Sequence, residues 1–305
     1  MIIDCDPGID DALALLLAFA NCDVSLVCTE PGNQNQEQSL ENALVWLSYL
    51  GQEVEVARGL EAPLQGPLKD AGDIHGKSSL ANLQWSKPSL SCSKRSAIDA
   101  MRASLEEKSQ VIVATGPLSN IAALITAHPW IKQRIEYISL MGGAATSGNV
   151  TPFAEFNFHA DPLAAKIVFS SQIPIVMSGL DVTHKAYLTL AQVREIENMG
   201  SDLAKRVAAM LRFYVKSSKN TAFLDTDFEG TVRMHDICAV SWVISPEIFK
   251  GQDCFVDIET RGLARGASFV DYRGKTGKAP NAKVLHSIDR NRLIEQLKNA
   301  ILKKG

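Results

Sequence analysis

The sequence predicts an α/β protein built on an open, mostly parallel β-sheet flanked by helices. Short apolar runs typical of strands alternate along the chain with longer runs of helix-forming residues, and this alternation favours a parallel sheet. Most of the strand-like runs end in glycine, asparagine, threonine or aspartate, which are residues that begin turns. No internal repeat or linker interrupts the pattern, so residues 1–305 are expected to form a single domain.

The N-terminal elements follow from apolar runs and their breakers. Met1–Ile3 begins a buried strand, Pro7 and Gly8 turn the chain, and a leucine- and alanine-rich run predicts a helix to about Asn21. A strand over 24–29, a helix through residue 50 and a short strand over 54–57 are predicted next. Residues 60–95 show no clear periodicity and contain three prolines, so this stretch is either a functional loop or hides an element.

The rest of the chain repeats the alternation of strand and helix. Strands are predicted over 110–115, 134–141 and 173–178, and helices over 97–105, 162–169, 190–217 and 235–243. The tail is expected to be β-rich from residue 254 and helical from about residue 290.

Composition narrows the class of function. The chain is 46% apolar and 21% charged, as in a globular protein with a sizeable core. Its net charge of -3 gives no reason to expect nucleic-acid binding. No run approaches the roughly 18 apolar residues of a membrane span, and the chain enters a strand with no basic leader, so a cytoplasmic protein with reduced cysteines is expected.

Four aspartates, Asp4, Asp6, Asp10 and Asp11, surround the Pro7-Gly8 turn. Asp6 falls at the end of the first strand, and Asp10 and Asp11 begin the next helix, where the dipole favours negative charge. Ligands of open α/β sheets bind at this edge. A hard cation such as Ca²⁺, which takes about six to eight oxygen ligands, would relieve the repulsion between these carboxylates. The plainer alternative is an acidic helix start with solvated neighbours.

The run DCDPGIDD at residues 4–11 resembles the N-terminal motif of the inosine-uridine nucleoside hydrolases. These are Ca²⁺-dependent enzymes that cleave the N-glycosidic bond of ribonucleosides. The resemblance covers nearly the whole chain, to about residue 301, and implies a Rossmann-like fold, Ca²⁺ as cofactor and a ribonucleoside as substrate. It also implies a homodimer or homotetramer.

Two further motifs follow the second and fourth predicted strands. Gly32-Asn33 resembles the family's Gly-Asn, which implies that Asn33 reaches the ribose. Relatives commonly have small or branched residues before this pair, whereas Glu30 and Pro31 stand here and could reshape the pocket wall. TGPLSN at 115–120 is similar to the family's TGPLTN, in which the threonine main-chain carbonyl binds the metal, so Thr115 is implied as a ligand.

The stretch 140–162 resembles the family segment that grips the sugar. The residues implied to contact the ribose or line its pocket are Met141, Asn149, Glu155 and Asn157. Glu155 and Asn157 stand two apart, so in an extended segment both side chains would point the same way. A polar surface loop is the alternative interpretation.

MHDICAV at 234–240 resembles the family's late His-Asp motif. The match implies that Asp236 is the remaining metal carboxylate, that His235 faces the leaving base, and that residues 220–229 form the base-side wall. His75 matches a motif at the pocket mouth. His184 also matches a family segment but is expected to be structural.

The residues and the resemblance together predict a mechanism of direct water attack with inversion at the sugar. Asp6 takes a proton from the water, Asp10 accepts a hydrogen bond from the 2′-hydroxyl, and Asp4 orients the metal ligands. Asn33 helps to stabilise an oxocarbenium-like transition state, and His235 assists departure of the base. The implied metal ligands are Asp6, Asp11, the Thr115 carbonyl and Asp236.

Two other functions are compatible with parts of the sequence. A strand followed by Asp4-Cys5-Asp6 is also typical of Mg²⁺-dependent phosphatases of the haloacid-dehalogenase type, in which Asp4 would be the nucleophile. Those enzymes typically have threonine or valine two residues after the second aspartate, whereas this chain has Gly8 there. A Ca²⁺-dependent nucleoside-binding protein without turnover is the second alternative. The sequence does not fix the preferred base.

Overall fold

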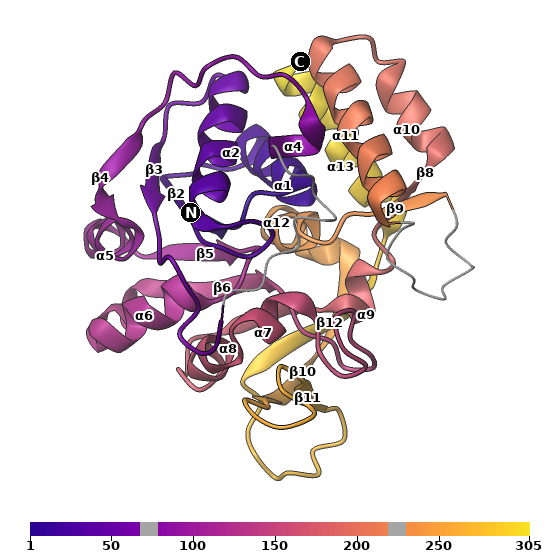
Figure 1. Cartoon of the computed structure of the whole chain (residues 1–305). Helices are drawn as coiled ribbons and strands as arrows, with labels where there is room; N and C mark the ends of the chain where they lie inside the picture. The colour runs from indigo at the N-terminus through magenta and orange to yellow at the C-terminus, as the bar shows by residue number, and fades with distance from the viewer. Residues whose placement is uncertain (68–78, 219–229) are drawn as a thin grey trace.

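The structure is a computed structural model that describes residues 1–67, 79–218 and 230–305 (Figure 1). Within these ranges the main sheet has ten strands. They are β1 (Ile2–Cys5), β2 (Leu26–Thr29), β3 (Glu55–Arg58), β4 (Cys92–Ser96), β5 (Gln110–Ala114), β6 (Ile135–Met141), β7 (Ile175–Ser178), β10 (Phe249–Ile258), β11 (Ser268–Asp271) and β12 (Ala282–Ile288). A separate two-stranded ladder pairs β8 (Tyr187–Thr189) with β9 (Thr231–Arg233).

The strand order is β11-β10-β12-β7-β6-β5-β1-β2-β3-β4. Strand β1 pairs in parallel with both β2 and β5, and the parallel pairing continues outward to β4 on one side and through β7 to β12 on the other. Strand β10 runs antiparallel to β12 and β11. The chain leaves β1 toward β2 and later returns to add β5 on its other side, so the order changes direction there. The predicted α/β fold with a mostly parallel sheet is confirmed.

Helices cover both faces of this sheet (Figure 1). The apolar layer on one face includes α1, α2, α11, α12 and α13, and the layer on the other includes α5, α6 and α8. The helices are α1 (Ile9–Asn21), α2 (Gln36–Tyr49), α4 (Ser79–Asn82), α5 (Ala97–Glu107), α6 (Ser119–Ala127), η1 (Pro129–Arg134), α7 (Phe156–Ala160), α8 (Pro162–Phe169), α9 (Leu180–Thr183), α10 (Leu190–Glu197), α11 (Asp202–Ser218), α12 (Ile237–Ile244), η3 (Pro246–Ile248) and α13 (Arg290–Lys304).

Helix α1 lies at the centre of its layer. Every residue from Ile9 to Ala18 is buried, and the helix packs against both α12 and α13. The indole Nε1 of Trp46 in α2 donates to the main-chain carbonyl of Ala12 at 2.8 Å. Because α1 is held on several sides, the acidic turn that precedes it is fixed relative to the sheet.

Three sequence predictions of secondary structure need correction. Strand β4 begins at Cys92, inside the stretch 60–95 where no strand was predicted, because its mostly exposed polar residues give no apolar pattern. The helix predicted over 190–217 is two helices, separated where Gly200 takes a φ of +87°. Strand β10 begins at Phe249, five residues before the predicted β-rich tail.

Two global expectations can be compared with the described residues. No helix among them combines the length and apolar character that would let it cross a membrane. All six cysteines are unpaired, and Cys5, Cys28 and Cys254 are buried within strands.

Truncation of a side chain in α1 tests the packing of this layer. Leu16 is fully buried, so Leu16→Ala should lower the free energy of unfolding by about 2–5 kcal/mol, through lost apolar burial and a residual cavity. Leu302 on α13 is 67% exposed, and Leu302→Ala should change the free energy of unfolding by no more than about 0.5 kcal/mol. Urea denaturation of both variants measures the difference. Equal losses would contradict the assignment of α1 to the core.

Candidate active site at the carboxyl edge of the sheet

The acidic loop lies where the carboxyl ends of β1, β2 and β5 meet. Asp6 directly follows β1, and its carboxylate sits between two glycines. A Cβ atom added at Gly32 would lie 2.1 Å from Asp6 Oδ2, and one at Gly116 would lie 2.7 Å from Oδ1. Both positions therefore require glycine. The main-chain amide of Asn33 donates to Asp6 Oδ2 at 2.6 Å, which ties the loop after β2 to the end of β1.

Asp11 is the most fully hydrogen-bonded carboxylate of the loop. Its Oδ2 accepts from the Gly8 amide at 2.9 Å and from Asn33 Nδ2 at 3.0 Å, and its Oδ1 accepts from Thr115 Oγ1 at 2.7 Å. Asn33 Nδ2 also donates to the main-chain carbonyl of Asp6 at 3.1 Å. These bonds join the ends of three strands through one buried side chain.

A compact group of carboxylates forms the centre of the site. Asp10, Asp11 and Asp236 each offer an oxygen within 4.8 Å of the others, and all three are buried. Asp236 comes from the N-terminal end of α12, more than two hundred residues away in the chain. Asp6 stands beside this group, since its charge is among the causes that raise the pKa of Asp236. Sequence reasoning assigned Asp10 to the sugar rather than to the carboxylate group it joins here.

Burial and the charges of neighbouring carboxylates govern the charge state of this group. Burial, followed by the charge of Asp11, raises the pKa of Asp6 well above its usual range and that of Asp10 to about 7. Burial and the charge of Asp10 raise the pKa of Asp236. Asp6 Oδ1 and Asp10 Oδ1 are buried with no hydrogen-bond partner among the described residues. Such a donor set fits a hard divalent cation, which would take the place of protons.

Asn157 connects the carbonyl of Thr115 to the end of β6. Its Nδ2 donates to the Thr115 carbonyl at 2.9 Å and to the Met141 carbonyl at 3.1 Å, and it lies 3.5 Å from Met141 Sδ. The carbonyl that sequence comparison implies as a metal ligand is thus oriented by a buried amide. These bonds link Asn157 and Met141 to Thr115, which itself bonds Asp11, and the contact of both residues with a ribose stays a prediction.

Glu155 and Asn149 accept hydrogen bonds from main-chain amides at the start of the short helix α7. Glu155 is its N-cap and accepts from the amides of Asn157 and Gly143 at 2.9 and 2.8 Å. Asn149 Oδ1 accepts from the Phe156 amide at 3.0 Å. The segment from Glu155 to Asn157 is therefore a helix start, and the prediction of an extended segment was wrong because these caps favour helix. Burial raises the pKa of Glu155 to about 7.

His235 lies between β9 and α12, one residue before Asp236. Its Nδ1 is 2.8 Å from the hydroxyl oxygen of Thr183 in α9, and its ring packs edge-on against that of His184 at a centroid distance of 5.9 Å. The side chain is partly exposed, whereas Asp236 beside it is buried. His75 and the segment 220–229, predicted to lie at the mouth and wall of the pocket, fall outside the described residues.

Glu30 is buried beneath the surface of the protein. Its side chain is fully buried, and its main-chain amide donates to the Cys5 carbonyl at 3.0 Å. Glu30 therefore does not line an exposed surface, and an effect of Glu30 and Pro31 on the pocket wall stays a prediction. Its carboxyl group lies beneath the acidic loop, where it neighbours Asp4.

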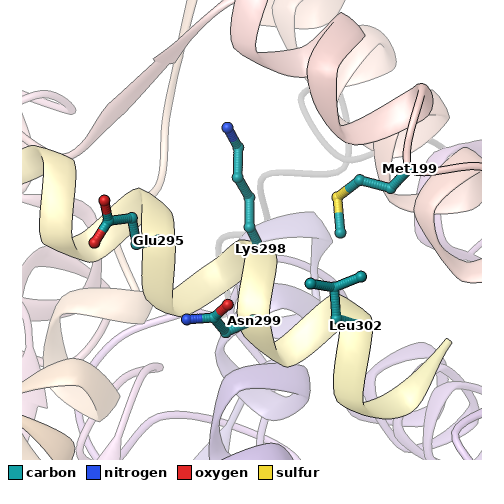
Figure 2. A pocket seen from close by; sticks show the side chains of 5 residues that line it. All are labelled: Met199, Glu295, Lys298, Asn299 and Leu302. Atoms are coloured by element: carbon teal, nitrogen blue, oxygen red, sulfur yellow. The ribbon is translucent and has the colours of Figure 1, made fainter.

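A surface hollow on α13 lies apart from the acidic group (Figure 2). Figure 2 shows Lys298, Glu295 and Leu302 on this helix, with Met199 opposite. Lys298 is paired at 2.6 Å with Glu195, and the lining contains no constellation of catalytic groups.

Three residues with direct roles in the site were assigned none by sequence reasoning. Thr183 holds His235, Asn120 donates to Asp4 Oδ1 at 2.9 Å, and Gly116 admits the carboxylate of Asp6. Asn120 and Gly116 lie within the TGPLSN motif, so the motif located them without specifying their contacts. Thr183 lies beside His184 in the segment that matches a family motif, but the motif did not specify its contact with His235, which follows β9.

Comparisons with known proteins agree with this geometry. Residues 1–295 match the family model described as inosine-uridine preferring nucleoside hydrolase. The pyrimidine-specific ribonucleoside hydrolase RihA of Salmonella paratyphi B is 40% identical over 303 residues, which cover 97% of this chain and 96% of the relative. A purine-preferring ribonucleoside hydrolase from Gardnerella vaginalis superposes with a TM-score of 0.91 at 30% identity, covering 99% and 98% of the two chains. A plant nucleoside hydrolase superposes with the same TM-score of 0.91 at 28% identity, and the match covers 98% of each chain.

Metal-free protein should lose thermal stability as pH rises. Asp10 and Glu155 have folded-state pKa values raised to about 7, so they bind protons more tightly folded than unfolded. Their contribution to stability is complete below their unfolded pKa values and is lost as pH rises through about 7. Melting temperature should therefore fall between about pH 5 and about pH 8.

Added Ca²⁺ should raise the melting temperature more at about pH 8 than at about pH 5, because protons compete for the same oxygens. Asp10→Asn serves as the control, since it removes one repelling charge. It should raise the melting temperature of the metal-free protein at the higher pH. A melting temperature that climbs from acid to alkaline pH without metal would contradict the assignment.

Proposed function

We propose that this chain, which belongs to the inosine-uridine preferring nucleoside hydrolase family and is an N-ribohydrolase, hydrolyses pyrimidine ribonucleosides with Ca²⁺ bound at the carboxylate group. Water and ribonucleoside give ribose and free base. The observation that carries the proposal is the buried group Asp10, Asp11 and Asp236 beside Asp6, at the carboxyl edge of the sheet. Base preference is inferred from the 40% identical pyrimidine-specific relative, and a homodimer or homotetramer from the family resemblance.

Four groups of this chain are suited to hold the cation. They are the carboxylates of Asp6, Asp11 and Asp236 and the main-chain carbonyl of Thr115. The bound cation would supply acidification of a water molecule and a grip on vicinal sugar hydroxyls. Asn33 and Thr115 Oγ1 keep the Asp11 carboxylate oriented, and Asn157 does the same for the Thr115 carbonyl. The ligands are therefore fixed before any cation arrives.

Asp6 is proposed as the general base. One of its oxygens is occupied by the Asn33 amide, whereas Oδ1 has no hydrogen-bond partner among the described residues. That oxygen can accept the proton of the attacking water. Asn33 and the surrounding negative charge would stabilise positive charge as it develops on the sugar.

The sugar and base contacts are assigned to residues around this centre. Asp10 is proposed to accept a hydrogen bond from the 2′-hydroxyl of the ribose. Its Oδ1 is buried and has no hydrogen-bond partner among the described residues. Met141, Asn149, Glu155 and Asn157 are proposed to line the rest of the ribose subsite. His235 is proposed as the acid for the leaving base, and His75 as a further contact at the base.

The phosphatase alternative is not favoured. Asp4, which would be its nucleophile, is fully buried and accepts a hydrogen bond from Asn120. A substrate phosphorus atom cannot reach a carboxylate in that position. A binding protein without turnover would have no need for the base at Asp6 or the partly exposed histidine at 235.

Incubation with nucleosides tests the reaction. Uridine and cytidine should release reducing sugar without phosphate, faster than inosine or adenosine. Prolonged chelation should abolish the release and Ca²⁺ should restore it. Nucleoside binding by calorimetry with no sugar release would support the binding protein, and phosphate release from a phosphate ester would support the phosphatase. Full activity in protein that elemental analysis finds metal-free would end the metal assignment.

Substitution of His235 tests the acid role. Uracil leaves poorly as an anion, so His235→Ala should lower kcat for uridine by about 10²- to 10⁴-fold. p-Nitrophenyl riboside releases a stable anion, so kcat of the variant for this substrate should be nearly unchanged. Thr183→Val removes the hydrogen bond to the ring while conserving shape, and should lower kcat for uridine alone, to a smaller degree. Equal losses on both substrates would instead indicate that His235 supports Asp236.

A further inference from the structure

Asp181 is a half-buried carboxylate that the mechanism above does not use. It lies in α9, which follows β7 at the carboxyl edge of the sheet. Its Oδ2 accepts from the Ala145 main-chain amide at 2.7 Å, and its Oδ1 accepts from Thr146 Oγ1 at 2.9 Å. Both oxygens therefore bind one loop, residues 142–149, which we call the β6 loop because it follows β6 directly.

The β6 loop is attached at both of its ends to residues of the proposed ribose subsite. It ends at Asn149, and near its start the Gly143 amide donates to Glu155 Oε2 at 2.8 Å. Asn149 and Glu155 are both proposed to line that subsite. The position of Asn149 thus depends on the path that the chain takes between the two ends of the loop.

The middle of this loop is held by Asp181. The start of the loop is bonded elsewhere, since the Gly143 carbonyl accepts from the first amide of α9 at 2.9 Å and Ser268 Oγ bonds both the amide and the carbonyl of Ala144, at 2.9 and 2.8 Å. Within the described part of the chain, residues 145–147 form no hydrogen bond to another element except the two to Asp181. Removing this carboxylate would therefore release the stretch that leads to Asn149.

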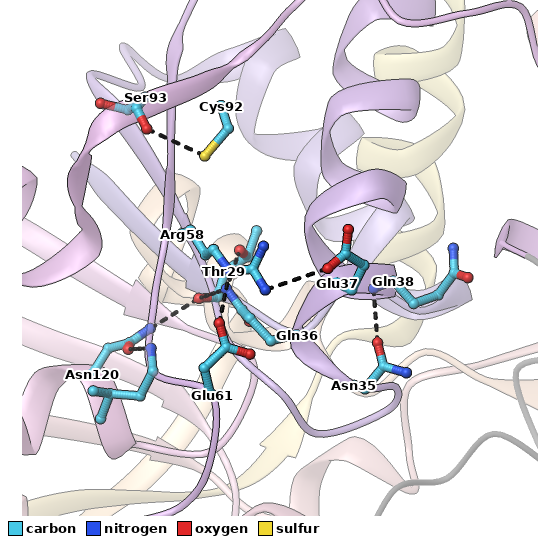
Figure 3. A network of polar contacts seen from close by, with 11 residues as sticks. Thr29, Asn35, Gln36, Glu37, Gln38, Arg58, Glu61, Cys92, Ser93 and Asn120 are labelled. Atoms are coloured by element: carbon cyan, nitrogen blue, oxygen red, sulfur yellow. Dashed lines mark hydrogen bonds and ion pairs between the residues drawn. The ribbon is translucent and has the colours of Figure 1, made fainter.

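An amide performs the corresponding task on the other side of β1, toward β2 and β3. Asn120 Nδ2 donates to the Thr29 carbonyl at 3.2 Å (Figure 3), and Asn120 Oδ1 accepts from the Leu60 amide at 2.9 Å. Asn120 meets one acceptor and one donor, which suits an amide. Asp181 instead meets two donors, a main-chain amide and a hydroxyl, and a carboxylate accepts both in charge-assisted hydrogen bonds.

We propose that Asp181 is a positioning residue for the ribose subsite. Its carboxylate fixes the middle of the β6 loop against α9, and so fixes Asn149, without touching the substrate. The inference rests on the proposed function, because it requires a ribose beside Asn149. The same short helix carries Thr183, whose hydroxyl contacts His235, so the experiment must separate an effect on the sugar from an effect on the base.

Two substitutions of similar shape separate hydrogen bonding from packing. Asp181→Leu removes both acceptors, whereas Asp181→Asn keeps an oxygen for the Ala145 amide and offers an amide to Thr146 Oγ1. Losing a hydrogen bond to a charged group costs about 10- to 100-fold in an equilibrium constant. Asp181→Leu should therefore raise KM for uridine by about tenfold or more, with kcat and Ca²⁺ affinity within about threefold of wild type. Asp181→Asn should stay within about threefold on all three.

Two controls locate the effect within the site. KM for p-nitrophenyl riboside should rise by the same factor as KM for uridine, because the two substrates share the ribose. A loss of kcat confined to uridine would place the effect on His235 instead and would overturn the inference. Thr146→Val removes only the more exposed of the two bonds, and should change KM by less than Asp181→Leu does.

Hydrogen exchange supplies a readout independent of metal and activity. In wild type the Ala145 amide should be protected, and in Asp181→Leu it should exchange about tenfold faster or more, with β6 unchanged. An unprotected Ala145 amide in wild type would overturn the inference even if Asp181→Leu did not fold. Equally faster exchange throughout the chain of Asp181→Leu would show general destabilisation, and would also overturn it.

The remaining outcomes distinguish this inference from the proposed function. Asp181→Leu with faster exchange at Ala145 but wild-type KM would reject the positioning role and leave the hydrolase intact. A wild-type protein that binds uridine but releases no ribose would reject the hydrolase, and the uridine affinities of wild type and Asp181→Leu, by calorimetry, would then decide the role of Asp181. Equal affinities would overturn it, and tenfold weaker binding by the variant would support it. A wild-type protein that neither binds nor cleaves uridine would reject both.

Discussion

Like charges crowded into a buried sheet edge are the constraint on which the rest of the site depends. Asp6, Asp10, Asp11 and Asp236 cannot all be ionised in so small a buried volume without a counterion. The fold must therefore stabilise their positions independently of their charge. It does so through helix α1, whose first ten residues are all buried, and through glycines that let the main chain approach Asp6. The charge that remains is available for a cation.

Three asparagines perform most of this positioning, and each uses its Nδ2 group in the same manner. Asn33 bridges the Asp6 carbonyl and the Asp11 carboxylate, Asn120 bridges Asp4 and the Thr29 carbonyl, and Asn157 bridges the carbonyls of Thr115 and Met141. Each follows a different strand or turn, so strand ends far apart in the sequence are joined pairwise. Amides suit this task because they donate without adding charge.

The sequence predicted the sheet and most of its strands because buried parallel strands are continuous apolar runs bounded by turn residues. It missed β4, whose polar residues form a half-exposed edge, and it misplaced Glu155, whose capping bonds produce a helix start. The acidic loop was located from spacing alone. Asp236 and Thr115 required family resemblance, since a single aspartate and a main-chain carbonyl carry no local pattern. The contact between Thr183 and His235 was not predicted, because the two residues are brought together only by tertiary packing.

The side chains that hold the carboxylates in place are uncharged, and this has a consequence for catalysis. A lysine or arginine beside Asp11 would satisfy the same lone pairs, but its positive charge would compete with the proposed cation and oppose positive charge on the sugar. Hydrogen bonds from amides and a threonine hydroxyl fix the carboxylates while preserving their field. The described donors to Asp11 thus hold its carboxylate without adding positive charge, and the negative potential there remains available for the proposed cation.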